Sequence, residues 1–474
     1  MLFTQQLFFI FLIIVFSAYW IIPNNKLVLK NILLLISSYI FYGWWDWRFL
    51  SLIFLSSLCD YLIALKIQSS EKKASKKIFL YLSLFVNLGL LFTFKYFNFF
   101  ISNAENLLMT LGFQANLPSL KIILPVGISF YTFQTLSYTI DVYRGNLKPT
   151  KSFISFFAFV SFFPQLVAGP IERASHLLPQ FSKVKSFCFQ NFENGCRIAL
   201  WGFFKKVVVA DNCANIANQA FENYQSLSGL PLFIGIIAFS FQIYGDFSGY
   251  SDIAIGISRM FGFDLMRNFN SPYLSRDIAE YWRRWHISLG TWFRDYLYIP
   301  LGGSRGGKYQ AIRNTFIIFL VSGFWHGANW TYILWGLIHA LLFLPLLLLG
   351  KNRNNTEDDI KISHLPKILT TYLLVCLAWI FFRAESIDVA LEFITNMLKI
   401  NSDKIFFNPY ILIISIVSSL ILLTSEFITQ NDESPLIWLK KRTNIAVRWA
   451  AYIIIINVTL IFQGHMQEFI YFQF

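Results

Sequence analysis

Apolar runs of membrane-spanning length recur along this 474-residue sequence, and they leave few folds open to it. Hydrophobic residues make up 56% of the chain and charged residues 14%, against about 45–50% and about 25% in soluble domains. Because hydrocarbon offers the backbone no hydrogen-bond partners, spanning segments are helices or closed barrels, and runs of about 20 apolar residues fit helices. The sequence therefore predicts an all-α, polytopic integral membrane protein with about 10–13 transmembrane or re-entrant helices.

The formal net charge of the chain is +13. A basic balance can indicate a nucleic-acid partner, but no nucleic-acid-binding module is recognisable, and we predict none. In a membrane protein the excess is typical of Lys and Arg retained in cytoplasmic loops. Two loops are assigned to that side, by Lys72, Lys73, Lys76 and Lys77 and by Lys440, Lys441, Arg442 and Arg448. Counting spans from these loops places both termini on the outer side of the bilayer.

The chain shows no clear internal linker. Only residues 350–367 read as a long solvated loop, so we expect one membrane-embedded domain over 1–474. The five cysteines form no CxxC pair and share no metal-ligand spacing with histidine. The sequence therefore predicts neither a metal site nor a disulfide framework.

A histidine lies inside the apolar run 316–336. His326 is flanked by Gly323 and Gly327, a small-xxx-small spacing that lets a neighbouring helix approach closely. If the helix continues, Ser322, His326 and Asn329 share one face. An ionisable group at bilayer depth is a functional-site hypothesis by default. The alternatives are a catalytic or proton-handling histidine and a structural histidine that bridges helices.

A second histidine, His286, lies among arginines and tryptophans in 280–298, which we expect to form one helix with an aromatic face at the membrane surface. On that helix Arg283 and Arg294 would share a side, about 16 Å apart along the axis. Arginine forks suit phosphate oxygens, so the pair is a candidate site for a donor such as coenzyme A. The alternative is that both arginines only anchor an interfacial helix.

Two further windows are too polar to face lipid. Residues 125–143 place Gln134 on a polar helix face, and residues 242–252 do the same with Asp246. Because unpaired polar groups are not tolerated against hydrocarbon, each face lines a cavity or has its partners within the protein. Gln134 and Asp246 are therefore candidate tunnel-lining residues, as are Ser322 and Asn329.

The two histidine segments occur within a longer series of motifs in a fixed order. These are Leu124–Tyr138, Phe163–Arg173, Tyr244–Gly256, Asn268–Tyr273, Trp282–Leu289, Phe293–Gly303, Phe324–Trp330 and Trp379–Ala384. Together the motifs resemble the membrane-bound O-acyltransferase family, and most closely its bacterial alginate O-acetyltransferase-like branch. The motif-bearing core covers about residues 120–345.

This resemblance implies a ring of membrane helices around a central tunnel, with His326 and His286 as the catalytic histidines. It implies acetyl transfer from cytoplasmic acetyl-CoA, as a substrate rather than a bound cofactor, for O-acetylation of an exported polysaccharide such as alginate or a cell-wall polymer. It also implies a bacterial inner-membrane location. Because the chain carries no soluble domain, we expect a periplasmic or extracellular acetyltransferase as its partner protein.

Two alternatives to polysaccharide O-acetylation remain open at this stage. One is a D-alanyl exporter for teichoic acids, and the other is a non-enzymatic transporter or flippase, although the chain shows no internal repeat of the kind common in transporters. The other four histidines, His176, His339, His364 and His465, are expected to lie outside the site.

Overall fold

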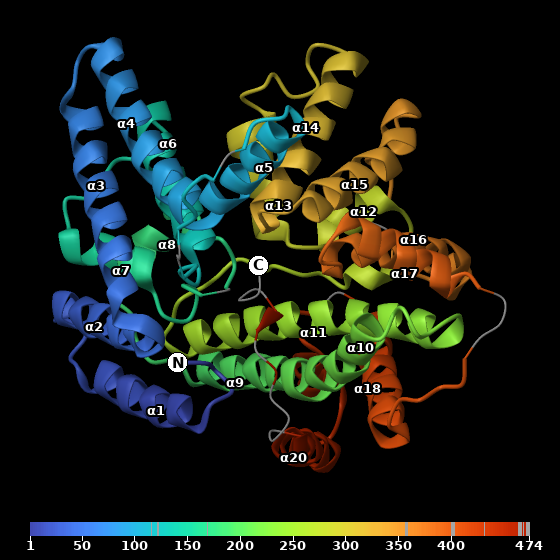
Figure 1. Cartoon of the computed structure of the whole chain (residues 1–474). Helices are drawn as coiled ribbons and strands as arrows, with labels where there is room; N and C mark the ends of the chain where they lie inside the picture. Colours follow the sequence, from blue (N-terminus) through green and yellow to red (C-terminus); the bar gives the residue numbers. More distant parts are fainter. Residues whose placement is uncertain are drawn as a thin grey trace. The chain divides into compact units, whose positions relative to one another are not determined.

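In the computed structural model, the regular secondary structure of the described residues is all helical, with no strand there (Figure 1). It describes residues 1–114, 116–120, 123–167, 169–355, 359–399, 403–430, 432–462, 467 and 469–470. The chain divides into two compact units, one of Met1–Phe192 with Ser258–Met266 and one of Glu193–Ile257 with Arg267–Phe474. The expectation of a single domain over 1–474 stays a prediction.

The first unit contains eight helices among its described residues. They are α1 (Gln6–Ile21), α2 (Leu27–Asp46), α3 (Leu50–Ser69), α4 (Lys73–Leu91), α5 (Phe97–Thr110), α6 (Ile128–Arg144), α7 (Phe153–Ser161) and α8 (Ala174–Leu177). Left-handed glycines at Gly127 and Gly145 bound α6, as expected of a residue without a β-carbon.

The second unit contains most of the remaining helices. They are α9 (Phe189–Phe203), α10 (Asp211–Glu222), α11 (Leu230–Met260), α12 (Ile278–Arg284), α13 (Ile287–Phe293), α14 (Lys308–His326), α15 (Trp330–Leu348), α16 (Leu365–Arg383), α17 (Ile387–Met397), α18 (Pro409–Ile428), α19 (Pro435–Arg442) and α20 (Ile445–Phe462). The first turn of α9 and the last residues of α11 belong to the first unit.

Seven helical stretches of the described residues are long and apolar enough to cross a membrane. They are Leu27–Ser69, Lys73–Thr110, Leu230–Met260, Trp330–Leu348, Ile362–Arg383, Pro409–Ile428 and Ile445–Phe462. The predicted all-α, multi-pass membrane fold is thus confirmed. Other predicted segments form short or buried helices, such as the 9-residue α7 and α6, most of which is buried.

Polar side chains inside the first unit find partners on neighbouring helices. The carboxylate of Asp60 on α3 is fully buried and accepts hydrogen bonds from Asn87 on α4 (2.8 Å), Thr139 on α6 (3.0 Å) and Ser83 on α4 (2.5 Å). Three helices are therefore joined at one carboxylate, as expected where water and lipid cannot satisfy polar groups.

In the second unit, α9 and α11 pack through glycines. A β-carbon on Gly202 would lie 2.6 Å from the carbonyl oxygen of Gly249, so only glycine permits this approach. Past α9 the π-helical turn Phe204–Ala210 carries Lys205, whose Nζ lies 2.6 Å from Asp252 on α11. Lys205 is buried, so it contributes an internal ion pair rather than a loop charge.

Helices α14 and α15 are also in close contact through glycines. A β-carbon on Gly336 would lie 2.2 Å from the carbonyl oxygen of Phe319, and one on Gly323 would lie 2.2 Å from that of Tyr332. The close approach that the small residue Gly323 predicts is therefore present. Because α14 ends at His326, this contact fixes the position of that histidine relative to α15.

Gly336→Ala should lower the stability of the protein by about 1–3 kcal/mol, because overpacking forces a backbone shift between α14 and α15. Thermal unfolding of the purified protein in detergent measures the change. Gly89→Ala on α4 is the matched control, since no atom lies within 4 Å of its added β-carbon. Equal melting temperatures for the two variants would contradict the close contact.

Candidate active site

A cavity of about 420 Å³ lies in the second unit between α12, α13 and α14. Its lining is mostly apolar and aromatic, with a few polar groups, which is usual for small-molecule sites. The lining residues are Trp282, Arg283, Trp285, His286, Ile287, Leu289, Gly290, Thr291, Phe293, Arg294, Ile318, Phe319, Ser322 and His326. The structure thus brings five predicted residues to one cavity: His326, His286, Arg283, Arg294 and Ser322.

His326 is the last residue of α14 and is buried. The chain becomes extended at Gly327, where a β-carbon would lie 2.1 Å from the ring of Tyr332. Aromatic rings surround the imidazole edge to face, with centroid distances of 5.3 Å to Trp335 and 5.3 Å to Phe382. One turn earlier, Ser322 lines the same cavity, as the i, i+4 spacing predicts.

The helix expected over 280–298 is not continuous. It breaks at His286, whose φ of 45° is left-handed, so α12 ends at Arg284 and α13 begins at Ile287. A non-glycine residue in this conformation is strained, and such strain clusters at functional sites. The ring of His286 is buried, and burial lowers its pKa to about 3. The imidazole is therefore neutral at physiological pH.

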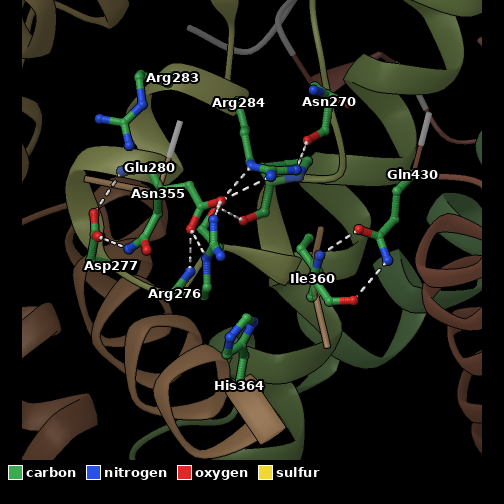
Figure 2. A network of polar contacts seen from close by, with 12 residues as sticks. Asn270, Arg276, Asp277, Glu280, Arg283, Arg284, Asn355, Ile360, His364 and Gln430 are labelled. Atoms are coloured by element: carbon green, nitrogen blue, oxygen red, sulfur yellow. Dashed lines mark hydrogen bonds and ion pairs between the residues drawn. The ribbon is translucent and has the colours of Figure 1, made fainter. Parts of the chain in front are cut away.

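A buried carboxylate stabilises α12, the helix that precedes this break. Figure 2 shows Glu280 of α12 between Arg276 and Arg284, which donate to it at 3.0 Å and 2.8 Å. The two guanidinium groups hold the pKa of Glu280 below its usual range despite its burial. Arg284 also donates to the carbonyl oxygen of Asn270 at 3.2 Å (Figure 2). This network fixes the C-terminal end of α12, where His286 follows.

The two candidate phosphate-binding arginines line the cavity but are exposed. Arg283 donates to the carbonyl oxygens of Asn352 (2.8 Å) and Asn354 (2.7 Å), and Arg294 pairs with Asp295 at 2.8 Å. Because the chain breaks between them, they do not lie on one continuous helix. Both charges remain accessible to an anion that enters from solvent.

Three other predicted residues have different surroundings. Asn329 lies beyond the end of α14, where its side chain accepts from the Thr331 amide and caps α15. Gln134 belongs to the first unit and donates to the carbonyl oxygen of Phe159 at 3.0 Å. Asp246 pairs with Lys206 at 2.7 Å. Each has internal partners, as the alternative in which polar faces are satisfied within the protein predicts, and a place for them in a tunnel lining stays a prediction.

Of the remaining histidines, the three that the structure describes do not line the cavity. His176 contacts Glu172 (2.7 Å) and Asp264 (3.4 Å), and these carboxylates raise its pKa to about 10. His339 accepts a hydrogen bond from the indole of Trp282 at 3.3 Å, and His364 accepts one from the Lys361 amide. His465 lies outside the described residues.

Sequence patterns did not identify two residues beside the site, Asn268 and Glu280. Asn268 lies in an irregular stretch, and Glu280 lies on the short helix α12 before His286. No helical periodicity therefore relates either residue to His286. Among the described residues, no group of three or more His, Cys, Asp or Glu side chains could hold a metal ion.

Comparison with known proteins gives a consistent result. The model of the MBOAT, or membrane-bound O-acyltransferase, family matches residues 39–383. A Pseudomonas aeruginosa protein named "Probable alginate O-acetylase AlgI" is 42% identical over 392 residues, which cover 82% of this chain and 73% of that protein. The Helicobacter pylori peptidoglycan O-acetyltransferase is 39% identical over 436 residues, 85% of this chain and 80% of its own. The Streptococcus thermophilus teichoic acid D-alanyltransferase is 31% identical over 46% of this chain and 55% of its own.

Lowering the pH should destabilise the protein through His286. Its pKa is lower in the folded state, so between pH 6.5 and about 3 only the unfolded state binds the proton. At pH 5.5 this costs about 1.4 kcal/mol relative to neutral pH. Unfolding free energies of wild type and His286→Gln at pH 7.5 and 5.5 measure it. Between pH 7.5 and pH 5.5 the unfolding free energy of the variant should fall by about 1.4 kcal/mol less than that of wild type. Equal decreases in the two proteins would mean that the imidazole of His286 is charged in the folded state.

Proposed function

Because the chain belongs to the membrane-bound O-acyltransferase family and is thus an O-acyltransferase, we propose that it moves acetyl groups from cytoplasmic acetyl-CoA across the membrane. The acetyl groups serve to O-acetylate an exported polysaccharide, either alginate-like or a cell-wall polymer. The similarity to an alginate O-acetylase and to a peptidoglycan O-acetyltransferase over more than four-fifths of this chain supports this substrate class.

The observation that carries the proposal is the cavity shared by His286 and His326. Two imidazoles, one at the end of α14 and one at the break between α12 and α13, line one cavity, and two arginines line it as well. Imidazole suits proton transfer near neutral pH, and guanidinium suits phosphate. A thioester donor with a phosphorylated nucleotide requires this combination.

In the proposed reaction His326 is the general base. It takes the proton of an acceptor hydroxyl while that oxygen attacks the acetyl carbon of the thioester. The carbon–sulfur bond breaks, an ester bond forms, and the thiolate of coenzyme A receives the proton. General-base catalysis of this kind typically contributes about 10²–10⁴-fold in rate.

The aromatic rings around His326 favour this role. Trp335 and Phe382 meet the imidazole edge to face, and Trp325 lies 4.9 Å from it between centroids. Aromatic faces attract a cation, so they stabilise the imidazolium that forms in the reaction. They also exclude water from the thioester, which limits its hydrolysis.

The donor enters from the cytoplasmic side in this proposal, because basic residues of the loop 299–308 follow α13. Arg283 and Arg294 bind the phosphates of coenzyme A, and the acetyl group reaches the histidines through the apolar cavity. A tunnel then leads to the outer side. There a periplasmic or extracellular acetyltransferase takes the acetyl group to the polymer, and both chain termini lie on that side of the bacterial inner membrane.

D-alanyl export is the second candidate, and the similarity to a teichoic acid D-alanyltransferase supports it. That similarity extends over less than half of the chain, whereas the similarity to the alginate O-acetylase covers 82%. Acetyl transfer is therefore the better supported of the two. A non-enzymatic transporter has no comparable support among these relatives.

Replacement of His326 tests the proposed base. His326→Ala should lower acetyl transfer from radiolabelled acetyl-CoA by at least about 10²-fold, with little change in melting temperature, because the general base is lost. His364→Ala, in the short 3-10 helix before α16 and outside the cavity, is the matched control and should retain activity. Unchanged turnover in His326→Ala would remove this histidine from the reaction.

Replacement of the two arginines tests the donor site. Arg283→Ala and Arg294→Ala should each raise KM for acetyl-CoA by about 10–100-fold, since a charge-assisted contact contributes about 1.5–3 kcal/mol. Neither should change KM for acetyl-pantetheine, a donor without the nucleotide phosphates. Equal effects on both donors would assign the arginines a structural role instead.

A further inference from the structure

We propose that Asn268 fixes the proton of His286 on Nδ1, so that Nε2 of this cavity-lining histidine carries the lone pair. Asn268 is a positioning residue in this view: it does not line the cavity, and it acts through the imidazole that does. The tautomer follows from the geometry alone, whereas its role in acetyl transfer rests on the proposed function.

Three donors converge on the side-chain oxygen of Asn268. The hydroxyl of Ser288 lies 2.9 Å from Oδ1, the backbone amide of Ser288 lies 3.4 Å from it, and Nδ1 of His286 lies 3.0 Å from it. The amide nitrogen of Asn268 faces the hydroxyl of Ser251 on α11 at 3.2 Å. Asn268 is fully buried, so water does not compete for these contacts.

The orientation of the Asn268 side-chain amide follows from which of its neighbours can donate and which can accept a hydrogen bond. A backbone N–H can only donate, so the Asn268 atom that faces the Ser288 amide is the oxygen. The hydroxyl of Ser251 accepts from the amide nitrogen on the other side. Because an amide oxygen can only accept, Nδ1 of His286 must carry the hydrogen. The neutral imidazole has one proton, and it is therefore absent from Nε2.

The backbone of Asn268 also stabilises the strained break between α12 and α13 at His286. The carbonyl oxygen of Asn268 accepts from the Ile287 amide at 2.9 Å, and the Asn270 amide donates to the Arg284 carbonyl at 2.9 Å. His286, with its φ of 45°, lies between these two bonds. Side chain and backbone of Asn268 thus fix both the conformation and the ring orientation of His286.

The tautomer restricts what His286 can do. With its proton held on Nδ1, it cannot donate a hydrogen bond from Nε2 to a thioester carbonyl at neutral pH. It can accept a hydrogen bond there. His286 is therefore an acceptor and not a donor at Nε2, and polarisation of the carbonyl must come from other groups.

The tautomer can be read directly by solid-state nitrogen NMR of the full chain, labelled at histidine and reconstituted in bilayers. His286→Gln assigns the His286 signals by their loss. We expect a protonated Nδ1 and an unprotonated Nε2 in wild type, and a mixture of tautomers in Asn268→Leu. A protonated Nε2 in wild type would overturn the proposal whatever the enzyme's activity is.

Kinetics test the consequence. Asn268→Leu should lower kcat for acetyl transfer by about 10–100-fold, the range found for partners that orient metal-ligating histidines, with KM for acetyl-CoA unchanged. Asn268→Asp keeps an acceptor for Nδ1 and should recover most of the loss, with a shifted pH profile because the carboxylate favours the imidazolium.

Asn212→Leu is the matched control for loss of a buried amide, since Asn212 on α10 donates to the carbonyl of Val208 in the π-helical turn before it. It should change stability without altering the His286 tautomer. If Asn268→Leu keeps wild-type kcat with a mixed tautomer, the tautomer has no role in the reaction. If no variant or wild type transfers acetyl groups, the proposed function fails while the NMR result stands.

Discussion

Polar groups at bilayer depth need partners within the protein, because the surrounding lipid offers no hydrogen bonds. The carboxylate of Asp60 joins three helices of the first unit, and Lys205 and Lys206 pair with Asp252 and Asp246 of α11 in the second. Such pairs cost much desolvation free energy and contribute specificity of packing more than net stability. They hold together the helices within each unit.

The same constraint explains the break between α12 and α13. Left-handed backbone at His286 is strained, and the surrounding bonds must outweigh that strain. Glu280 holds α12 through two arginines, and the Asn268–Asn270 segment holds the residues on both sides of the break. The outcome is an imidazole in a fixed orientation at the wall of a mostly apolar cavity. Together with the family relationship, this supports acyl transfer between a thioester and a hydroxyl.

Periodicity predicted the parts of the site that lie on regular helices. Ser322 and His326 share α14 and line one cavity, as their spacing predicts. It failed where helices end: α14 stops at His326, so Asn329 caps the next helix instead. The left-handed turn at His286 has no local signal such as glycine, and Asn268 reaches His286 through irregular chain. Such contacts depend on tertiary structure, which spacing along the sequence does not encode.

Protection of the cavity by the donor tests the central claim most directly. Ser322→Cys, in a background whose five cysteines are replaced by serine, places a thiol in the cavity wall one turn from His326. Acetyl-CoA should slow maleimide labelling of this thiol, and it should leave labelling of an exposed Ser226→Cys control unchanged. Labelling of Ser322→Cys at the same rate with and without saturating acetyl-CoA would contradict the account, because the donor would then not enter the cavity between the two histidines.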